Sequence, residues 1–143
     1  MSNLSLFLKS NKTAKENVFY PATKSLCDKD GKPLQWELKP LSTAQNEAIQ
    51  DACMSEVPVK GKPNMYRPKL DTNAYLKKVI CNCVVFPDLY SKELQDSYGV
   101  MTPEDLLMEM VDEPAEYQDF AKFVQKLNGF DVSLEDKVNE AKN

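Results

Sequence analysis

Cysteines and carboxylates are the residues of this chain that could do chemistry, because its 143 residues include no histidine. Histidine is the usual general base near neutral pH, so the commonest catalytic arrangement is missing. The spacing of Cys27, Cys53, Cys81 and Cys83 matches no disulfide framework and no zinc site. Cys81 and Cys83 are two residues apart on an expected helix, so they point to nearly opposite faces and cannot easily share a metal. We interpret the cysteines as buried and reduced.

The carboxylates form no catalytic pair in the sequence. Asp112, Glu113 and Glu116 lie close together where a helix is expected to begin, and we interpret them as solvated residues that offset the helix dipole. The segment 28–32, DKDGK, has two carboxylates, but no glutamate further on closes a calcium loop. The glycines are scattered singly, so no phosphate-binding loop is predicted. The sequence therefore predicts no catalytic, cofactor or metal site.

Charge is divided unevenly along the chain. Residues 1–87 have 13 Lys or Arg and 8 Asp or Glu, whereas residues 88–143 have 5 Lys and 14 Asp or Glu. The acidic C-terminal part argues against a nucleic-acid partner. It suits a basic protein partner, although solvated outer helix faces explain the same charges equally well. The apolar runs are far shorter than the roughly 20 residues of a membrane helix, so no membrane partner is expected.

The first 40 residues predict a leader followed by a β-hairpin. Residues 1–16 form a polar leader that we expect to dock through Leu6 and Phe7. Within the expected hairpin, residues 17–39, the strand around Trp36 alternates apolar and polar side chains. The preceding Asp30-Gly31 pair favours a tight turn, because glycine accepts positive φ.

Residues 41–70 predict one helix and an irregular connection. Ser42 and Gln45 fit a capping box at the start of a helix that runs to residue 54. The segment 55–70 contains three prolines and predicts a loop that ends in a short third strand at 65–70, paired with the hairpin. A disordered functional loop is the alternative interpretation.

Residues 71–143 predict a helical part centred on the helix 71–85. Its apolar residues recur at helical spacing on a wide face, so it should pack against several other helices. Asp71 is the expected N-cap, and Pro87 ends the element. Further helices are expected to begin at Ser91, Thr102, Pro114 and Ser133.

These elements predict a single domain over residues 1–143, of the α+β class and mainly α. An N-terminal β-hairpin, with room for a third short strand, packs on a bundle of five to six helices. Its expected parts are the leader and hairpin at 1–40, the helix at 41–54, the loop at 55–70 and the helical part at 71–143.

Three C-terminal stretches carry a family resemblance: FPDLYSKELQDSYGV, EYQDFAKFVQKLNGFD and the final EDKVNEAKN. They resemble the tail assembly chaperones of PBSX-like contractile-tailed phages and prophages, the XkdN-like family. The earlier DKDGKPLQWELKPLS followed by a helix is similar to that family's N-terminal half. The resemblance is densest over residues 71–143 and leaves residues 55–69 unaligned.

The resemblance implies a protein that performs no reaction and uses no cofactor. Such chaperones bind the tape measure protein, a very long helical chain, and keep it soluble until tube subunits polymerise around it. The tail tube protein is a second candidate partner, and self-association is left open. The expected location is the cytoplasm of the bacterial host, with the protein absent from the mature virion. A tail-completion or baseplate adaptor retained in the virion is the alternative, and a small enzyme or enzyme inhibitor is a third.

The expected contact surface for the partner lies near the C-terminal helices. Its apolar side chains are Phe123, Phe130, Leu134, Val138 and Ala141. An amphipathic helix docking in a groove is the natural mode of contact, with the acidic helix faces attracting a basic partner.

Overall fold

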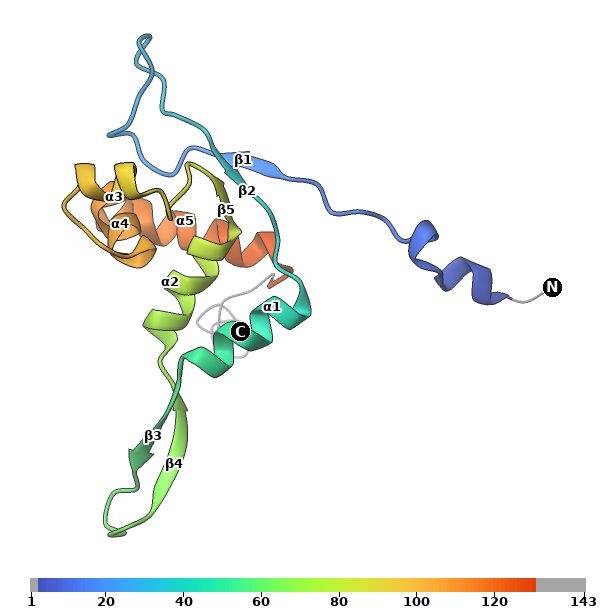
Figure 1. Ribbon diagram of the computed structural model, residues 1–143, viewed down its shortest axis with the longest axis vertical. Helices are drawn as coiled ribbons and strands as arrows, with labels where there is room; N and C mark the ends of the chain where they lie inside the picture. The colour runs from blue at the N-terminus through green and yellow to red at the C-terminus, as the bar shows by residue number, and fades with distance from the viewer. Residues whose placement is uncertain (1–2, 131–143) are drawn as a thin grey trace, which may run out of the picture.

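The computed structural model describes residues 3–130 and places helix α2 (Thr72–Cys83) at the centre of the fold (Figure 1). Helices α1, α4 and α5 all pack on it. The Asp71 carboxylate accepts a hydrogen bond from the Ala74 amide at 3.1 Å, which confirms the predicted cap. Cys81 and Cys83 are both buried although they point in different directions, because helices cover α2 on several sides.

The other described elements follow the predicted order, with five α-helices in all. They are η1 (Asn3–Phe7), η2 (Lys9–Asn11), β1 (Val18–Tyr20), β2 (Trp36–Leu38), α1 (Thr43–Ala52), β3 (Met54–Pro58), β4 (Tyr66–Leu70), β5 (Val84–Phe86), α3 (Lys92–Ser97), α4 (Pro103–Met110) and α5 (Pro114–Leu127). The α+β, mainly α class is confirmed. The helix expected from Ser133 lies outside the described residues. No helix in the described part of the chain is both long and apolar enough to cross a membrane.

Three of the predicted helix starts are capped by hydrogen bonds from the expected side chains. Ser42 and Gln45 form the complete capping box at the start of α1. The Ser91 hydroxyl accepts from the Leu94 amide at 3.3 Å at the start of α3. The Thr102 hydroxyl accepts from the Asp105 amide at 3.1 Å at the start of α4. Local sequence therefore sets where these helices begin.

An antiparallel sheet of order β1-β2-β5 covers one side of the helices. The hairpin prediction is confirmed, although its paired strands are shorter than expected. The third strand is β5, which follows α2 directly and pairs with β2. The predicted helix 71–85 therefore ends two residues early, because residues 84 and 85 enter the sheet instead. On the inner face of β2, Trp36 and Leu38 are buried in the core.

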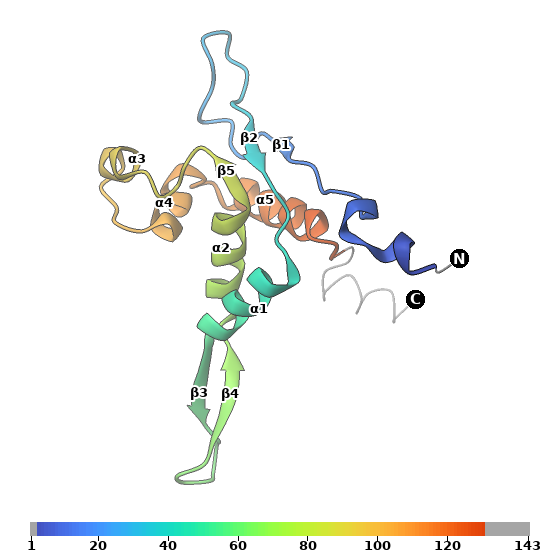
Figure 2. The same ribbon diagram turned by 45° about the vertical axis from the view of Figure 1, so that its right-hand side comes forward.

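The segment 55–70 forms a second β-hairpin, so the predicted loop is wrong. Strands β3 and β4 pair with each other from Met54↔Leu70 to Pro58↔Tyr66. The strand expected at 65–70 is present, but it does not pair with the N-terminal hairpin. The β3–β4 hairpin projects from the body beyond the start of α2 (Figures 1 and 2).

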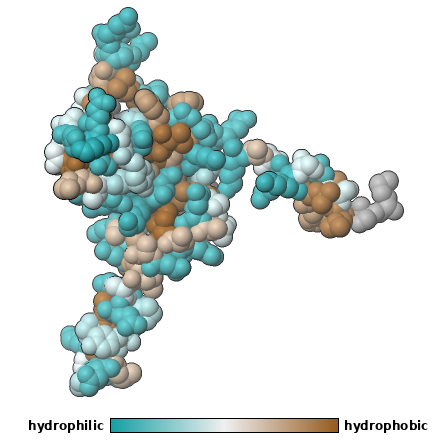
Figure 3. All heavy atoms as spheres, viewed as in Figure 1, coloured by the Kyte–Doolittle hydropathy of each residue, from teal (hydrophilic) through white to brown (hydrophobic). Residues whose placement is uncertain are grey.

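The N-terminal leader does not dock on the body, contrary to expectation. It forms two short 3-10 helices on an extended arm that leads away from the body (Figure 1). Leu6 and Phe7 are 71% and 83% exposed, respectively. Apolar side chains therefore gather on the surface of the arm (Figure 3). We call residues 3–17 the N-terminal arm.

Candidate protein-interaction surface

Three of the four cysteines are buried, as predicted, but Cys27 is exposed. Cys27 lies beside the turn of the first hairpin, where no helix covers it, so that part of the prediction is wrong. Burial raises the pKa of Cys81 to about 12 and also raises the pKa values of Cys53 and Cys83. These buried thiols therefore stay protonated near neutral pH and are poor nucleophiles.

We expect Cys27 alone to react with a thiol reagent in the native protein. At about pH 8, Cys27 is accessible, whereas the other three thiols are buried and protonated. Titration with Ellman's reagent should give about one thiol natively and four after unfolding. A Cys27→Ser variant should give none natively and three after unfolding. Rapid native reaction of the other three thiols would contradict this burial.

The three carboxylates singled out in the sequence do not form a common site. Glu116 accepts hydrogen bonds from the Thr23 hydroxyl at 2.7 Å and from the Lys24 amide at 2.8 Å. These bonds, the Lys24 amide first, hold the pKa of Glu116 below its usual range. Asp112 and Glu113 are exposed. Glu116 therefore connects α5 to the segment after β1. Within residues 3–130, no group of His, Cys, Asp or Glu is arranged to hold a metal.

The expected contact residues differ in their exposure, and some lie outside the described part of the chain. Phe123 stacks on Tyr20 with ring centroids 4.3 Å apart, so much of it is covered by the sheet. Phe130, just after α5, is 51% exposed. Leu134, Val138 and Ala141 lie outside the described residues. Among the expected contact residues that the structure describes, Phe130 is therefore the one with an exposed apolar side chain.

A groove runs beside Phe130, between the N-terminal arm and the start of α1. Its larger part has a volume of about 610 Å³. A smaller hollow of about 150 Å³ adjoins it at Phe130. The two share the lining residues Lys15, Leu41, Ser42 and Thr43. We call the combined hollow the arm groove.

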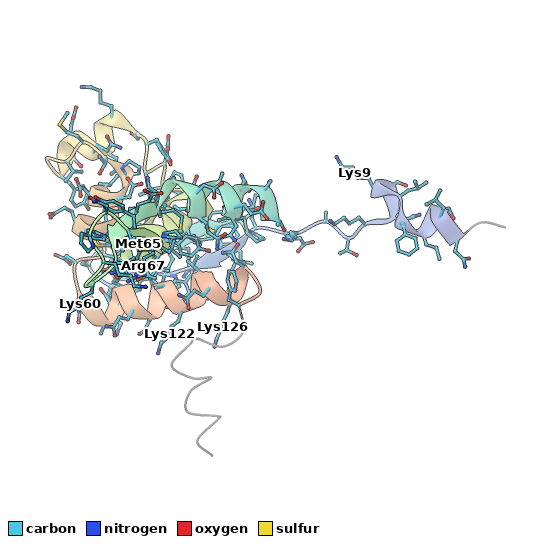
Figure 4. The ribbon with its side chains drawn as sticks, turned by 90° about the horizontal axis from the view of Figure 1, so that it is seen from below. Lys9, Lys60, Met65, Arg67, Lys122 and Lys126 are labelled. Atoms are coloured by element: carbon cyan, nitrogen blue, oxygen red, sulfur yellow. The ribbon has the colours of Figure 1, made fainter. Side chains whose placement is uncertain are left out.

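The arm groove has apolar patches and a basic lining. Leu41 and Phe130 contribute apolar surface, while the lysines of the lining are Lys9, Lys12, Lys15 and Lys39. Figure 4 shows Lys9 on the arm, well away from the helices. The sequence predicted acidic helix faces around the contact residues. The structure instead places Lys15, from the base of the N-terminal arm, in the hollow that Phe130 lines, while Lys9, Lys12 and Lys39 line the larger part of the groove.

Asn128 lines the smaller hollow of this groove and connects three segments of the chain. Its side-chain oxygen accepts a hydrogen bond from the Leu41 amide at 2.7 Å. Its side-chain nitrogen donates to the Val124 carbonyl at 2.9 Å and to the Cys83 sulfur at 3.3 Å. One side chain therefore joins the segment before α1, the end of α2 and the end of α5. Asn128 was not predicted as a site residue, because no local sequence pattern distinguishes it from an ordinary helix-ending asparagine.

The outer face of the three-stranded sheet is a second apolar surface, which was not predicted from the sequence. Phe19 and Phe86 are both opposite Glu37 in the sheet register, and both are exposed. Residues opposite one another in a sheet share a face, so the two rings flank one carboxylate. The alternation of side chains between the two faces of the strand at residues 18–20 could have indicated that Phe19 is exposed. The pairing of β5 with β2, which brings Phe86 to the same face, was not visible in the sequence.

Residues 4–142 match the family described as Phage XkdN-like tail assembly chaperone protein. The chain belongs to this family. The resemblance stated from the sequence is therefore confirmed over nearly the whole chain.

Individual relatives agree with the family assignment. The chain is 26% identical over 141 residues to the phage-like element PBSX protein XkdN of Bacillus subtilis (strain 168), covering 99% of this chain and 94% of that protein. It is also 26% identical to the uncharacterized protein YqbN of the same strain, covering 99% and 93%. The crystal structure of YqbN has the same fold, with a TM-score of 0.75 at 21% identity over 92% of this chain and 99% of that chain.

Proposed function

We propose that this member of the XkdN-like family binds the tape measure protein and keeps it soluble while the tail tube assembles around it. The observation that carries the proposal is family membership over residues 4–142. In this proposal the protein performs no reaction, works in the cytoplasm of the bacterial host and is absent from the mature virion. The tail tube protein is a second candidate partner, because it assembles around the tape measure protein to which this chain would be bound.

The arm groove supports this proposal with a surface of suitable chemistry. A long helical chain with an exposed apolar stripe aggregates unless another protein covers that stripe. The groove offers the exposed Phe130 ring, and the N-terminal arm that lines its other side has the exposed apolar residues Leu6 and Phe7 further along. An amphipathic helix that lies in a groove buries such a stripe against side chains of this kind.

The basic lining of the groove defines the matching partner segment. Lys9, Lys12 and Lys15 would pair with carboxylates that flank the apolar stripe of the bound helix. The proposed segment of the tape measure protein is therefore an amphipathic helix with acidic flanks. This reverses the charge expected from the sequence, where acidic faces were assigned to the contact surface.

We expect coexpression with the cognate tape measure protein to raise the soluble yield of that protein. The Phe130→Asp variant should weaken binding about tenfold, equivalent to about 1.4 kcal/mol, because it places a charge at an aromatic contact. Soluble yield and pull-down of the purified pair measure this effect. Tyr90→Asp is the matched control, since Tyr90 is 60% exposed but does not line the groove.

Two results would overturn the proposal. One is an unchanged soluble yield of the tape measure protein in the presence of the wild-type chain. The other is detection of the chain in purified mature virions by mass spectrometry, which would favour the structural adaptor. Equal losses for Phe130→Asp and Tyr90→Asp would place the contact outside the arm groove.

A further inference from the structure

The β3–β4 hairpin, residues 54–70, stands apart from the rest of the fold. Its two strands pair with each other and with no third strand. Nearly all of its residues are exposed, and only Leu70 at its base packs against the core. An isolated two-stranded hairpin is marginally stable in water. Its projection from the body therefore leaves an unpartnered sheet face that another surface could cover.

The strand register divides the hairpin into two different faces. Cross-strand partners share a face, and successive residues alternate between faces. One face is largely apolar and contains Met54, Glu56, Pro58, Tyr66, Pro68 and Leu70. The opposite face contains Ser55, Val57, Arg67 and Lys69, so both of its charged groups are cations. We call this second side the basic face.

Among residues 3–130, the cationic side chains of the hairpin form no ion pair with a carboxylate. The hairpin has four of them, Lys60, Lys62, Arg67 and Lys69, against the single carboxylate of Glu56. The ion pairs among residues 3–130 are Lys78–Glu104 and Lys92–Asp96, and neither lies in the hairpin. Figure 4 looks along the hairpin and shows Lys60 and Arg67 on it. The basic face is therefore available to an acidic surface.

The chain itself has a surface of the complementary charge. Residues 88–130 have 10 Asp or Glu and 3 Lys. Asp105 and Glu109 are one turn apart on α4, both exposed, so their like charges repel. Glu109 also lies in the last turn of α4, where the helix dipole disfavours a negative charge. Met101, 90% exposed, precedes this helix and presents an apolar side chain beside it.

The hairpin cannot reach this acidic surface within one molecule. It leaves the body at the start of α2, whereas α3 and α4 lie near the other end of that helix (Figures 1 and 2). We propose that the basic face of the hairpin docks on the α4 surface of a second copy of this chain. Arg67 and Lys69 then pair with Asp105 and Glu109 of the neighbouring copy. The contact is head to tail, because different surfaces of the two copies meet.

Sedimentation velocity of the full chain at about 0.05 M and about 0.5 M salt tests this contact. We expect concentration-dependent association at low salt that weakens at high salt. Arg67→Glu combined with Lys69→Glu should raise the dissociation constant at least about tenfold. Lys122→Glu combined with Lys126→Glu is the matched control, because it changes the net charge equally from exposed positions on α5.

A mixing experiment distinguishes a specific contact from a general charge effect. Asp105→Lys combined with Glu109→Lys should fail to associate alone, but should associate with the Arg67→Glu, Lys69→Glu variant. Circular dichroism checks that each variant is folded. A wild-type chain that stays monomeric to about 100 µM at low salt overturns the proposal, as do equal losses for the hairpin and α5 variants. Tape measure binding through Arg67 and Lys69 by a monomer would also overturn it, while leaving the proposed function standing.

Discussion

Replacing Phe120 by alanine is expected to lower the free energy of unfolding by about 3–5 kcal/mol. Phe120 is fully buried, and its ring makes an edge contact with Trp36 at a centroid distance of 5.5 Å. It also stacks on Tyr20 at 5.5 Å. Removing it leaves a cavity between α5 and the sheet, which the surrounding side chains can fill only in part. The loss is a large fraction of the stability of a typical domain.

Chemical denaturation followed by the fluorescence of Trp36 measures this loss directly. Trp36 is the single tryptophan of the chain and contacts the replaced ring, so its emission reports on the same part of the core. Phe130→Ala is the matched control and should change the free energy of unfolding by no more than about 0.5 kcal/mol, because its ring is half exposed. A Phe120→Ala loss below about 1 kcal/mol would contradict the packing described here.

The parts of the fold that the sequence predicted well are those that depend on local chemistry. Ser42, Ser91 and Thr102 were predicted as helix starts from their side chains, and each accepts the expected hydrogen bond. These interactions join residues only three positions apart. A single sequence contains all the information they need.

Predictions that depended on distant parts of the chain were less successful. Residues 84–86 continue the apolar pattern of α2, yet they form a strand because β2 offers a free edge. Pro58 and Pro68 favoured a loop, yet a two-stranded hairpin tolerates prolines, since each of its strands is an edge. Pairing partners of this kind are not visible in local sequence patterns.

Only part of the candidate site was predicted, because the rest depends on contacts between distant parts of the chain. Phe123 and Phe130 both fall near the C-terminal end of α5, but contact with Tyr20 from β1 covers only the former. The lysine that lines the same hollow as Phe130 is Lys15 of the N-terminal arm, more than 100 residues earlier in the chain. The sequence predicted an exposed apolar contact, and the fold decided which charges surround it.

Replacing Asn128 by alanine is expected to lower the free energy of unfolding by about 2–3 kcal/mol. The amide of buried Leu41 loses its acceptor, and the Val124 carbonyl loses a donor. Leaving a buried donor without a partner costs more than the net value of the lost hydrogen bond. Thermal or chemical unfolding measures the change. Asn82→Ala is the matched control, since its exposed side chain donates only to the Lys78 carbonyl and should contribute less than about 0.5 kcal/mol.

The same replacement tests whether the groove must be held rigid to bind a partner. Asn128 joins the segment before α1 to the ends of α2 and α5, and it lines the same hollow as Phe130. Its loss should weaken tape measure binding even at temperatures where the variant is fully folded, because the groove would have to be ordered on binding. Unchanged affinity of Asn128→Ala, together with the loss expected for Phe130→Asp, would mean that the exposed ring binds without a preformed groove. A parallel loss in both variants would instead assign the binding energy to the ring and its support together.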